Sequence, residues 1–146
     1  MQQTTPIEIG IAVADLDRML DFYARVLSCT EERRADIPGS MSGPLAVSED
    51  GYLNVWLTTP NGERIKLMRP PSPPASAVVA DYLTTQSGIA FFTFYCSDLT
   101  ATLALAEELG AVVRSDRSFI EEGLSLRLCF LTDPEGNVFE LVERNP

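Results

Sequence analysis

The chain repeats one pattern of elements twice, and this repeat limits its possible folds more than any other feature. IEIGIAVADLDRMLDFYARVL (7–27) and IAFFTFYCSDLTATLALAEEL (89–109) each read as a strand, an Asp-Leu pair and a helix. Later in each half, TPNGERIKLM and DPEGNVFELV read as a turn followed by a strand. The repeat predicts two modules, each a strand, a helix and three more strands, with the helix covering one sheet face.

Both helices have clear start signals. Asp15 is placed to cap a helix whose apolar residues recur at helical spacing, and Asp98 is placed to cap a second helix over 99–109 that ends at Gly110. The apolar positions of the first helix are Leu16, Met19, Leu20, Tyr23 and Leu27.

The turn residues predict two hairpins. One joins strands 52–59 and 63–69 through Pro-Asn-Gly, and the other joins strands 127–132 and 138–143 through DPEGN.

The remaining stretches are less regular. We expect a loop over an open side of the domain at 31–51, a short helix at 78–83, a short strand at 111–114 and a loop at 115–123.

A proline-dense segment near the middle of the chain, RPPSPPASA, separates the two halves. We therefore expect a first βαβββ module at 1–69, a linker at 70–87 and a second module at 88–146.

Composition excludes several functions. The formal net charge of −10, with no run of basic residues, argues against a nucleic acid or membrane partner. We see no signal peptide or membrane span, and three widely spaced cysteines fit unpaired thiols in a reducing cytoplasm. The chain has no histidine, which removes imidazole metal ligands and histidine bases.

Two motifs, IGIAVADLDRMLDFYARVL with its Phe22-Tyr23 pair and FLTDPEGNVFEL, make the chain resemble the vicinal oxygen chelate superfamily. This superfamily includes glyoxalase I, bleomycin resistance proteins and extradiol dioxygenases. The resemblance implies an α+β fold in which two βαβββ modules form curled mixed sheets around a cavity, with helices on the outer face. It also implies a small-molecule ligand and a homodimer.

The resemblance places the family's four metal positions on Glu8, Lys66, Phe91 and Glu140. Only Glu140 matches the usual His or Glu ligand of the last strand, and Phe91 has no donor atom. We therefore expect no transition-metal site and no cofactor. A weak Mg²⁺ or Ca²⁺ site at Glu8 and Glu140 is the alternative, and a nearby lysine would oppose it.

These positions supply the catalytic candidates. Glu140, or else Glu8, would be a general base, and Lys66, the only lysine, would stabilise an oxyanion or bind a substrate carboxylate. The alternative is a purely structural bridge from Lys66 to Glu8 or Glu140. Candidate ligand contacts are Phe91, Thr93, Tyr95, Trp56 and Arg127, although such aromatic residues are more often core and we favour core for Trp56.

Two functions from different classes remain open. The first is an isomerase or lyase that removes a proton next to a carbonyl without the family's metal. The second is a protein that sequesters a cationic or aromatic compound, as metal-free bleomycin resistance proteins do. A metal enzyme with a different ligand set is a third, weaker possibility.

Overall fold

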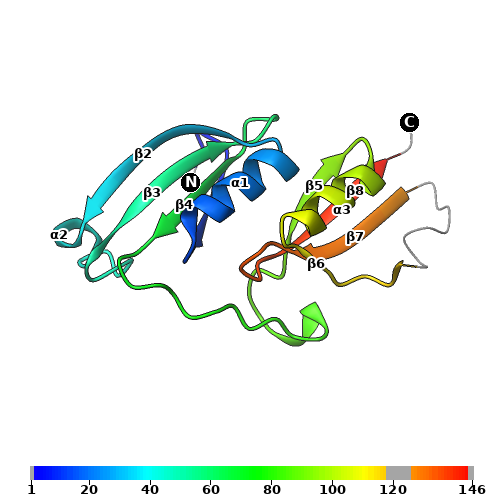
Figure 1. The fold of residues 1–146 in the computed structure, drawn as a ribbon. Helices are drawn as coiled ribbons and strands as arrows, with labels where there is room; N and C mark the ends of the chain where they lie inside the picture. Colours follow the sequence, from blue (N-terminus) through cyan, green and yellow to red (C-terminus); the bar gives the residue numbers. More distant parts are fainter. Residues whose placement is uncertain (1, 118–125, 145–146) are drawn as a thin grey trace. The chain divides into compact units, whose positions relative to one another are not determined.

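The structure is a computed structural model that describes residues 2–117 and 126–144. It divides into two compact units, 1–75 and 76–146, each of which is described by itself (Figure 1).

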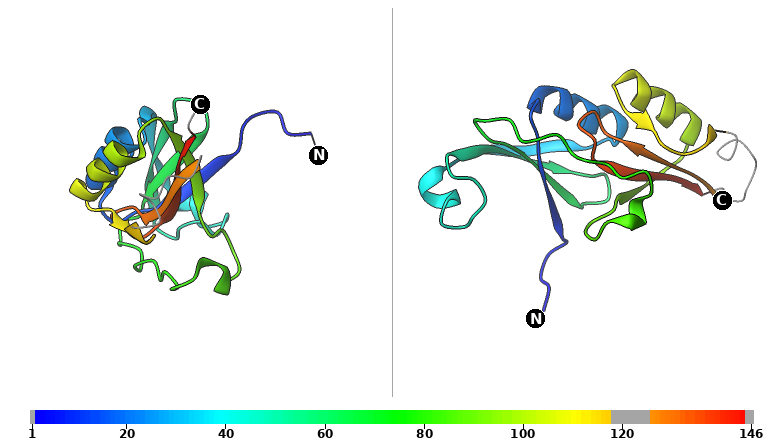
Figure 2. Two further views of the ribbon diagram at one scale, coloured as in Figure 1. Left: turned by 90° about the vertical axis from the view of Figure 1, so that its right-hand side faces the viewer. Right: turned by 90° about the horizontal axis from the view of Figure 1, so that it is seen from below.

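The first unit is one α-helix against a four-stranded sheet. Its elements in chain order are β1 (Glu8–Ala12), α1 (Leu16–Val26), β2 (Thr30–Pro38), the short α2 (Gly39–Ser42), β3 (Gly51–Thr58) and β4 (Arg64–Arg69). The strand order is β1-β4-β3-β2, in which β1 is parallel to β4 and the other pairs are antiparallel. Figures 1 and 2 show α1 lying along one face of this sheet.

The second unit repeats this plan. It contains the 3₁₀ turn η1 (Leu83–Thr85), β5 (Phe92–Cys96), α3 (Leu99–Glu108), β6 (Val112–Val113), β7 (Leu126–Thr132) and β8 (Val138–Arg144). The strand order is β5-β8-β7-β6, with β5 parallel to β8. The predicted α+β fold built from two βαβββ modules is therefore confirmed.

Alternation along the strands creates the core of each unit. In the first unit Ile11, Val55, Leu57, Ile65 and Leu67 are buried together with the apolar face of α1. In the second unit Cys129, Leu131, Phe139 and Leu141 are buried with Leu99, Leu103 and Ala106 of α3. We call the opposite side of each sheet, which carries the alternate residues such as Lys66 and Glu140, its helix-distal face.

Both predicted helix caps are present. The Asp15 carboxylate accepts a hydrogen bond from the Arg18 N–H at 3.1 Å, and Asp98 accepts one from the Ala101 N–H at 2.9 Å. Gly110 has a φ of 96°, a left-handed conformation that suits glycine and ends the second helix.

Three expectations for the irregular stretches need correction. Most of 31–51, expected as a loop, is strand β2 and helix α2. Residues 78–82, expected as helix, have no regular structure, and only Leu83–Thr85 forms a 3₁₀ turn. The predicted strand at 111–114 is confirmed as the shorter β6, and the loop expected at 115–123 lies partly outside the described residues.

No helix among residues 2–117 and 126–144 is long and apolar enough to cross a membrane.

Candidate functional site

The internal repeat places Lys66 and Glu140 at corresponding points of the two sheets. Gly10 of β1 pairs with Lys66 of β4, and Thr93 of β5 pairs with Glu140 of β8. The spacing from Asp15 to Asp98, which aligns the two halves, also carries Gly10 onto Thr93. The alignment of the two halves inferred from the sequence therefore agrees with the strand register of the folded protein. The side chains of Lys66 and Glu140 each lie on the helix-distal face of their own sheet.

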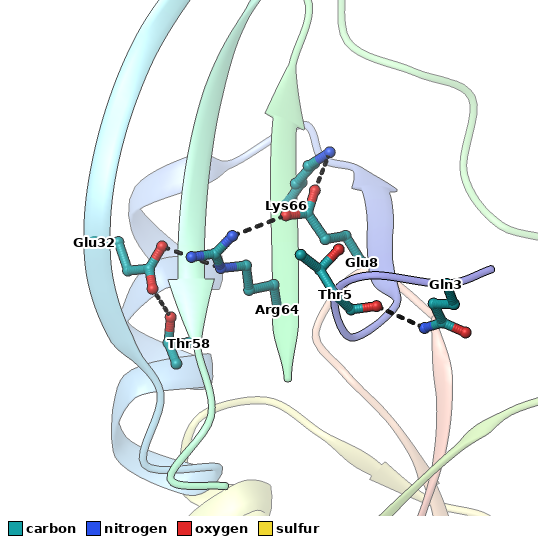
Figure 3. Close-up of polar contacts among 7 residues, drawn as sticks. All are labelled: Gln3, Thr5, Glu8, Glu32, Thr58, Arg64 and Lys66. Carbon is teal, nitrogen blue, oxygen red and sulfur yellow. Dashed lines mark hydrogen bonds and ion pairs between the residues drawn. The ribbon is translucent and has the colours of Figure 1, made fainter. Parts of the chain in front are cut away.

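In the first unit, Glu8 and Lys66 form an ion pair. The Lys66 ammonium contacts Glu8 Oε2, and Arg64 donates to Glu8 Oε1 at 3.3 Å, so both oxygens of this carboxylate have cationic partners. Figure 3 shows Lys66, Glu8 and Arg64 together on the sheet face opposite α1. The hydrogen bond from Lys66, supported by Arg64, lowers the pKa of Glu8.

The ion-pair network continues across the sheet. Arg64 Nε lies 3.4 Å from Glu32 Oε2, and the Thr58 hydroxyl donates to the other oxygen of Glu32 (Figure 3). The side chains of Glu8 and Lys66 are 29% and 31% exposed, so solvent screens the pair only in part. Charges of alternating sign thus link β1, β4 and β2, and the Thr58 hydroxyl joins β3 to them.

Arg64 and Glu32 were not predicted as members of this network. Period-2 alternation in ERIKLMR puts Arg64 on the face of Lys66, so a signal for it was present. Glu32 lies where the register between β2 and β3 shifts, at Glu31/Arg33. Such a bulge changes which side chains face the neighbouring strand, and the sequence contains no clear signal for its position.

In the second unit, Glu140 is held by one neighbour. Thr93 Oγ1 donates to Glu140 Oε2 at 2.7 Å, and no other described residue bonds to this carboxylate. Phe130, the cross-strand partner of Glu140 on β7, stacks edge to face with Phe91 at 4.9 Å between ring centroids. The half-buried carboxylate is therefore oriented by a hydroxyl beside an aromatic pair and keeps Oε1 available.

The remaining ligand candidates occupy different positions. Tyr95 lies on the face of Thr93, is 60% exposed and accepts a hydrogen bond from Arg144 at 3.1 Å. Arg127 lies on the opposite, helix-side face, where it bonds to Glu143 at 3.0 Å and to the Thr100 hydroxyl at 2.9 Å. The guanidinium of Arg127 thus anchors the start of α3.

The expectation that Trp56 is a core residue is wrong. It lies half-buried on the helix-distal face of the first sheet, paired with Arg33 of β2 and Lys66 of β4. Its neighbour on that face, Asn54, is only 2% exposed, and Asn54 Oδ1 has no hydrogen-bond partner among the described residues. This face therefore combines an indole ring with polar groups.

The four family positions do not fit a transition metal. Both oxygens of Glu8 are bonded to Lys66 and Arg64, an ammonium occupies the second position, and Phe91 offers no donor. Among residues 2–117 and 126–144, no three His, Cys, Asp or Glu side chains are grouped so that they could hold an ion.

The cysteines are also not arranged as nucleophiles. All three are free thiols, as expected. Burial raises the pKa of the Cys29 thiol to about 11, and it raises the pKa of Cys96 and Cys129 as well. A reactive cysteine needs a lowered pKa, so the carboxylates remain the best candidates for chemistry.

Two hollows lie away from these carboxylates. A cavity of about 560 Å³ in the first unit is lined by residues that include Asp36, Tyr52 and Arg69. A smaller cavity of about 200 Å³ in the second unit lies between residues of 77–90 and the β7–β8 turn. Neither is lined by Glu8, Lys66 or Glu140, so we base the candidate site on the hydrogen-bond geometry.

Comparison with known proteins identifies relatives along almost the whole chain. A sequence profile of the Glyoxalase/Bleomycin resistance protein/Dioxygenase superfamily matches residues 5–141. A probable chloroplastic lactoylglutathione lyase of Arabidopsis thaliana is 26% identical over 147 residues, which cover 96% of this chain and 36% of that protein. The chain thus spans about a third of this relative's length.

Solved structures share the fold. A glyoxalase family protein from Bacillus cereus matches with a TM-score of 0.83 and 22% identity, covering 100% of this chain and 97% of that one. Glyoxalase I from Zea mays matches with a TM-score of 0.70 and 19% identity, covering 97% of this chain and 45% of that one. A fosfomycin resistance protein from Listeria monocytogenes, solved with Mn(II) and sulfate, gives 0.64 and 13%, covering 99% and 95%.

Proposed function

Because the chain belongs to the Glyoxalase/Bleomycin resistance protein/Dioxygenase superfamily, we propose that it is an isomerase or lyase acting on a small carbonyl compound, with Glu140 as the base. The observation that carries this proposal is the Thr93–Glu140 hydrogen bond. It holds one carboxylate oxygen and leaves the other available, which is the arrangement a general base needs.

Glu140 is a better base than Glu8. The two oxygens of Glu8 are bonded to Lys66 and Arg64, and its lowered pKa weakens it as a proton acceptor. Glu140 has one neutral hydroxyl donor among the described residues and lies beside Phe91 and Phe130. We therefore assign proton removal to Glu140 and a structural role to Glu8.

Lys66 is the candidate for binding an anionic group of a ligand on the first sheet. An ammonium has three N–H donors, and Glu8 occupies one of them. The reaction would need no metal. With an α-hydroxycarbonyl substrate, Glu140 removes the C–H proton of the hydroxyl-bearing carbon, a C=C bond forms and the carbonyl electron pair moves onto its oxygen. The hydroxyl proton then passes to that oxygen, a carbonyl forms at the other carbon, and protonated Glu140 returns its proton to the former carbonyl carbon.

The test is proton exchange in heavy water. Lactoylglutathione, the compound in the name of the Arabidopsis relative, and a panel of α-hydroxycarbonyl compounds are incubated with the protein, and deuterium incorporation is measured by NMR. We expect Glu140→Gln to reduce exchange by a factor of about 10²–10⁴, the usual contribution of a general base, without loss of folding.

Two variants control this experiment. Thr93→Val should lower the rate less than Glu140→Gln, because the carboxylate remains but is no longer oriented. Glu135→Gln, a substitution of the same kind in the preceding turn, should leave the rate unchanged. Exchange that is as fast in Glu140→Gln as in the wild type would refute the role of this residue.

A sequestering protein is the second candidate. Phe91 and Phe130 stack beside Glu140, and Tyr95 is exposed on the same sheet face, so aromatic surface surrounds a carboxylate. Such a surface suits a cationic aromatic compound. Recovery of a tightly bound ligand without chemical change, together with no deuterium exchange for any compound, would favour sequestration.

A further inference from the structure

Arg33 is a cation whose donors are not used within the described part of the protein. Its guanidinium lies over the Trp56 ring, 3.9 Å from the ring centroid, and it makes no hydrogen bond or ion pair with any described residue. A guanidinium has five N–H donors.

The carboxylates nearest to Arg33 in sequence are engaged elsewhere. Both oxygens of Glu31 accept from Arg34, at 2.8 and 2.6 Å, and this contact lowers the pKa of Glu31. Glu32 is bonded to Arg64 and Thr58. The N–H donors of the Arg33 guanidinium are therefore not used by either of these carboxylates and are available to a ligand.

The strand register fixes where Arg33 lies. Arg33, Trp56 and Lys66 are cross-strand neighbours in one row on β2, β3 and β4. The cation–π contact with the indole restrains the guanidinium, and its N–H donors have no partner among the described residues. Preorganisation of this kind lowers the conformational entropy that the arginine side chain must lose when a ligand binds.

The local charge of this face differs from that of the whole protein. Arg33, Arg64 and Lys66 carry three positive charges here against the two negative charges of Glu8 and Glu32, whereas the chain has a net charge of −10. A small anion is therefore attracted to this row in a protein that otherwise repels it.

We propose that Arg33, positioned over the Trp56 ring, binds the carboxylate of a small organic acid on the helix-distal face of the first sheet. A planar carboxylate can accept two parallel hydrogen bonds from a guanidinium group. This site does not depend on Glu140 or on catalysis, so it can be tested whether or not the protein turns over a carbonyl compound.

Trp56 provides the readout because it is the only tryptophan. The protein is titrated at constant low ionic strength with acetate, glycolate and cyclohexanecarboxylate while the tryptophan emission is recorded, and isothermal calorimetry gives an independent Kd. We expect saturable binding that Arg33→Met weakens by about ten- to a hundredfold, the size expected for losing hydrogen bonds to a charged group.

Two variants separate binding from general charge and from folding. Arg18→Met removes the same charge from an exposed position on α1 and should leave the Kd unchanged. Arg33→Lys keeps the charge but not the planar fork, and should bind more weakly than the wild type. An equal response to chloride, tighter binding of inorganic phosphate, or an unchanged Kd in folded Arg33→Met would overturn the proposal.

Discussion

At the scale of single residues, the pairing of Lys66 with Glu8 was one of the outcomes that the sequence predicted, and its consequences were only partly predictable. Both residues alternate with buried apolar neighbours, so their common face could be inferred. Arg64 is the second cation that bonds to the Glu8 carboxylate. Because of this contact, the charge of Glu8 is balanced and the residue is not available as a base. The action of Lys66 on a ligand stays a prediction.

The Glu8–Lys66 pair should make the protein less stable as the pH falls into the acidic range. The folded-state pKa of Glu8 lies below its ordinary value of 4.5, so the stabilisation is present above pH 4.5 and is lost as the pH falls through the folded-state pKa. Lys66→Met should lower the free energy of unfolding at pH 7 by about 0.5–1 kcal/mol, because the pair is partly screened.

Urea denaturation of wild type and Lys66→Met at pH 7, 5, 4 and 3 measures this effect. The difference between the two proteins should shrink at the acidic end. Arg18→Met, which removes an exposed positive charge from α1 that has no ion pair with any described residue, should cost less at pH 7. A Lys66→Met difference that stays constant down to pH 3 would contradict the assignment to Glu8.

At the scale of elements, the stretches predicted correctly are those in which apolar period and turn chemistry agree. Strand β2 was missed because its sequence, TEERRADIP, has no apolar alternation. It pairs with β3 on one side only, so hydrogen bonding and not burial makes it a strand. Conversely, 78–83 was expected as a helix, yet Val78 is 84% exposed and Tyr82 is 76% exposed, so these side chains form no buried apolar face.

The start of α3 depends on a residue far away in the sequence. Glu143 Oε2 accepts from the Leu99 N–H at 2.8 Å and from Arg127 at 3.0 Å, so this carboxylate caps the helix and pairs with an arginine. Glu143→Ala would leave both donors without this acceptor and should lower the free energy of unfolding by about 1–3 kcal/mol. Glu49→Ala, at an exposed loop position, is the control and should change stability little.

Thermal and urea denaturation of these two variants measure the effect. Equal stabilities of Glu143→Ala and Glu49→Ala would show that the contact between β8 and α3 contributes nothing. The same experiment tests the structural role of Arg127, since Arg127→Met should lose part of the same stabilisation.

At the scale of the whole molecule, the repeat made the architecture predictable, because both halves follow the same order of strands, helix and turns. The family positions are spread over both halves, two in each unit. Their chemistry could be read from residue types alone, whereas the contacts that occupy Glu8 and orient Glu140 required the folded strands.

The residues at the four family metal positions predict that the intact protein works without a metal ion. We expect elemental analysis of purified protein to find far less than one Zn, Mn, Fe or Ni per chain, and deuterium exchange to persist after dialysis against a chelator. Addition of Mg²⁺ or Ca²⁺ tests the weak alternative at Glu8 and Glu140. One tightly held ion per chain, whose removal abolishes exchange, would show that this protein uses a ligand set different from the family positions.

The presence of a single lysine has a practical consequence. Reductive methylation with isotopically labelled formaldehyde modifies only the α-amino group and Lys66. The dimethylated side chain keeps its positive charge, and its methyl resonance would report the environment of one atom next to Glu8. One spectral line could therefore follow every compound that disturbs this face of the sheet.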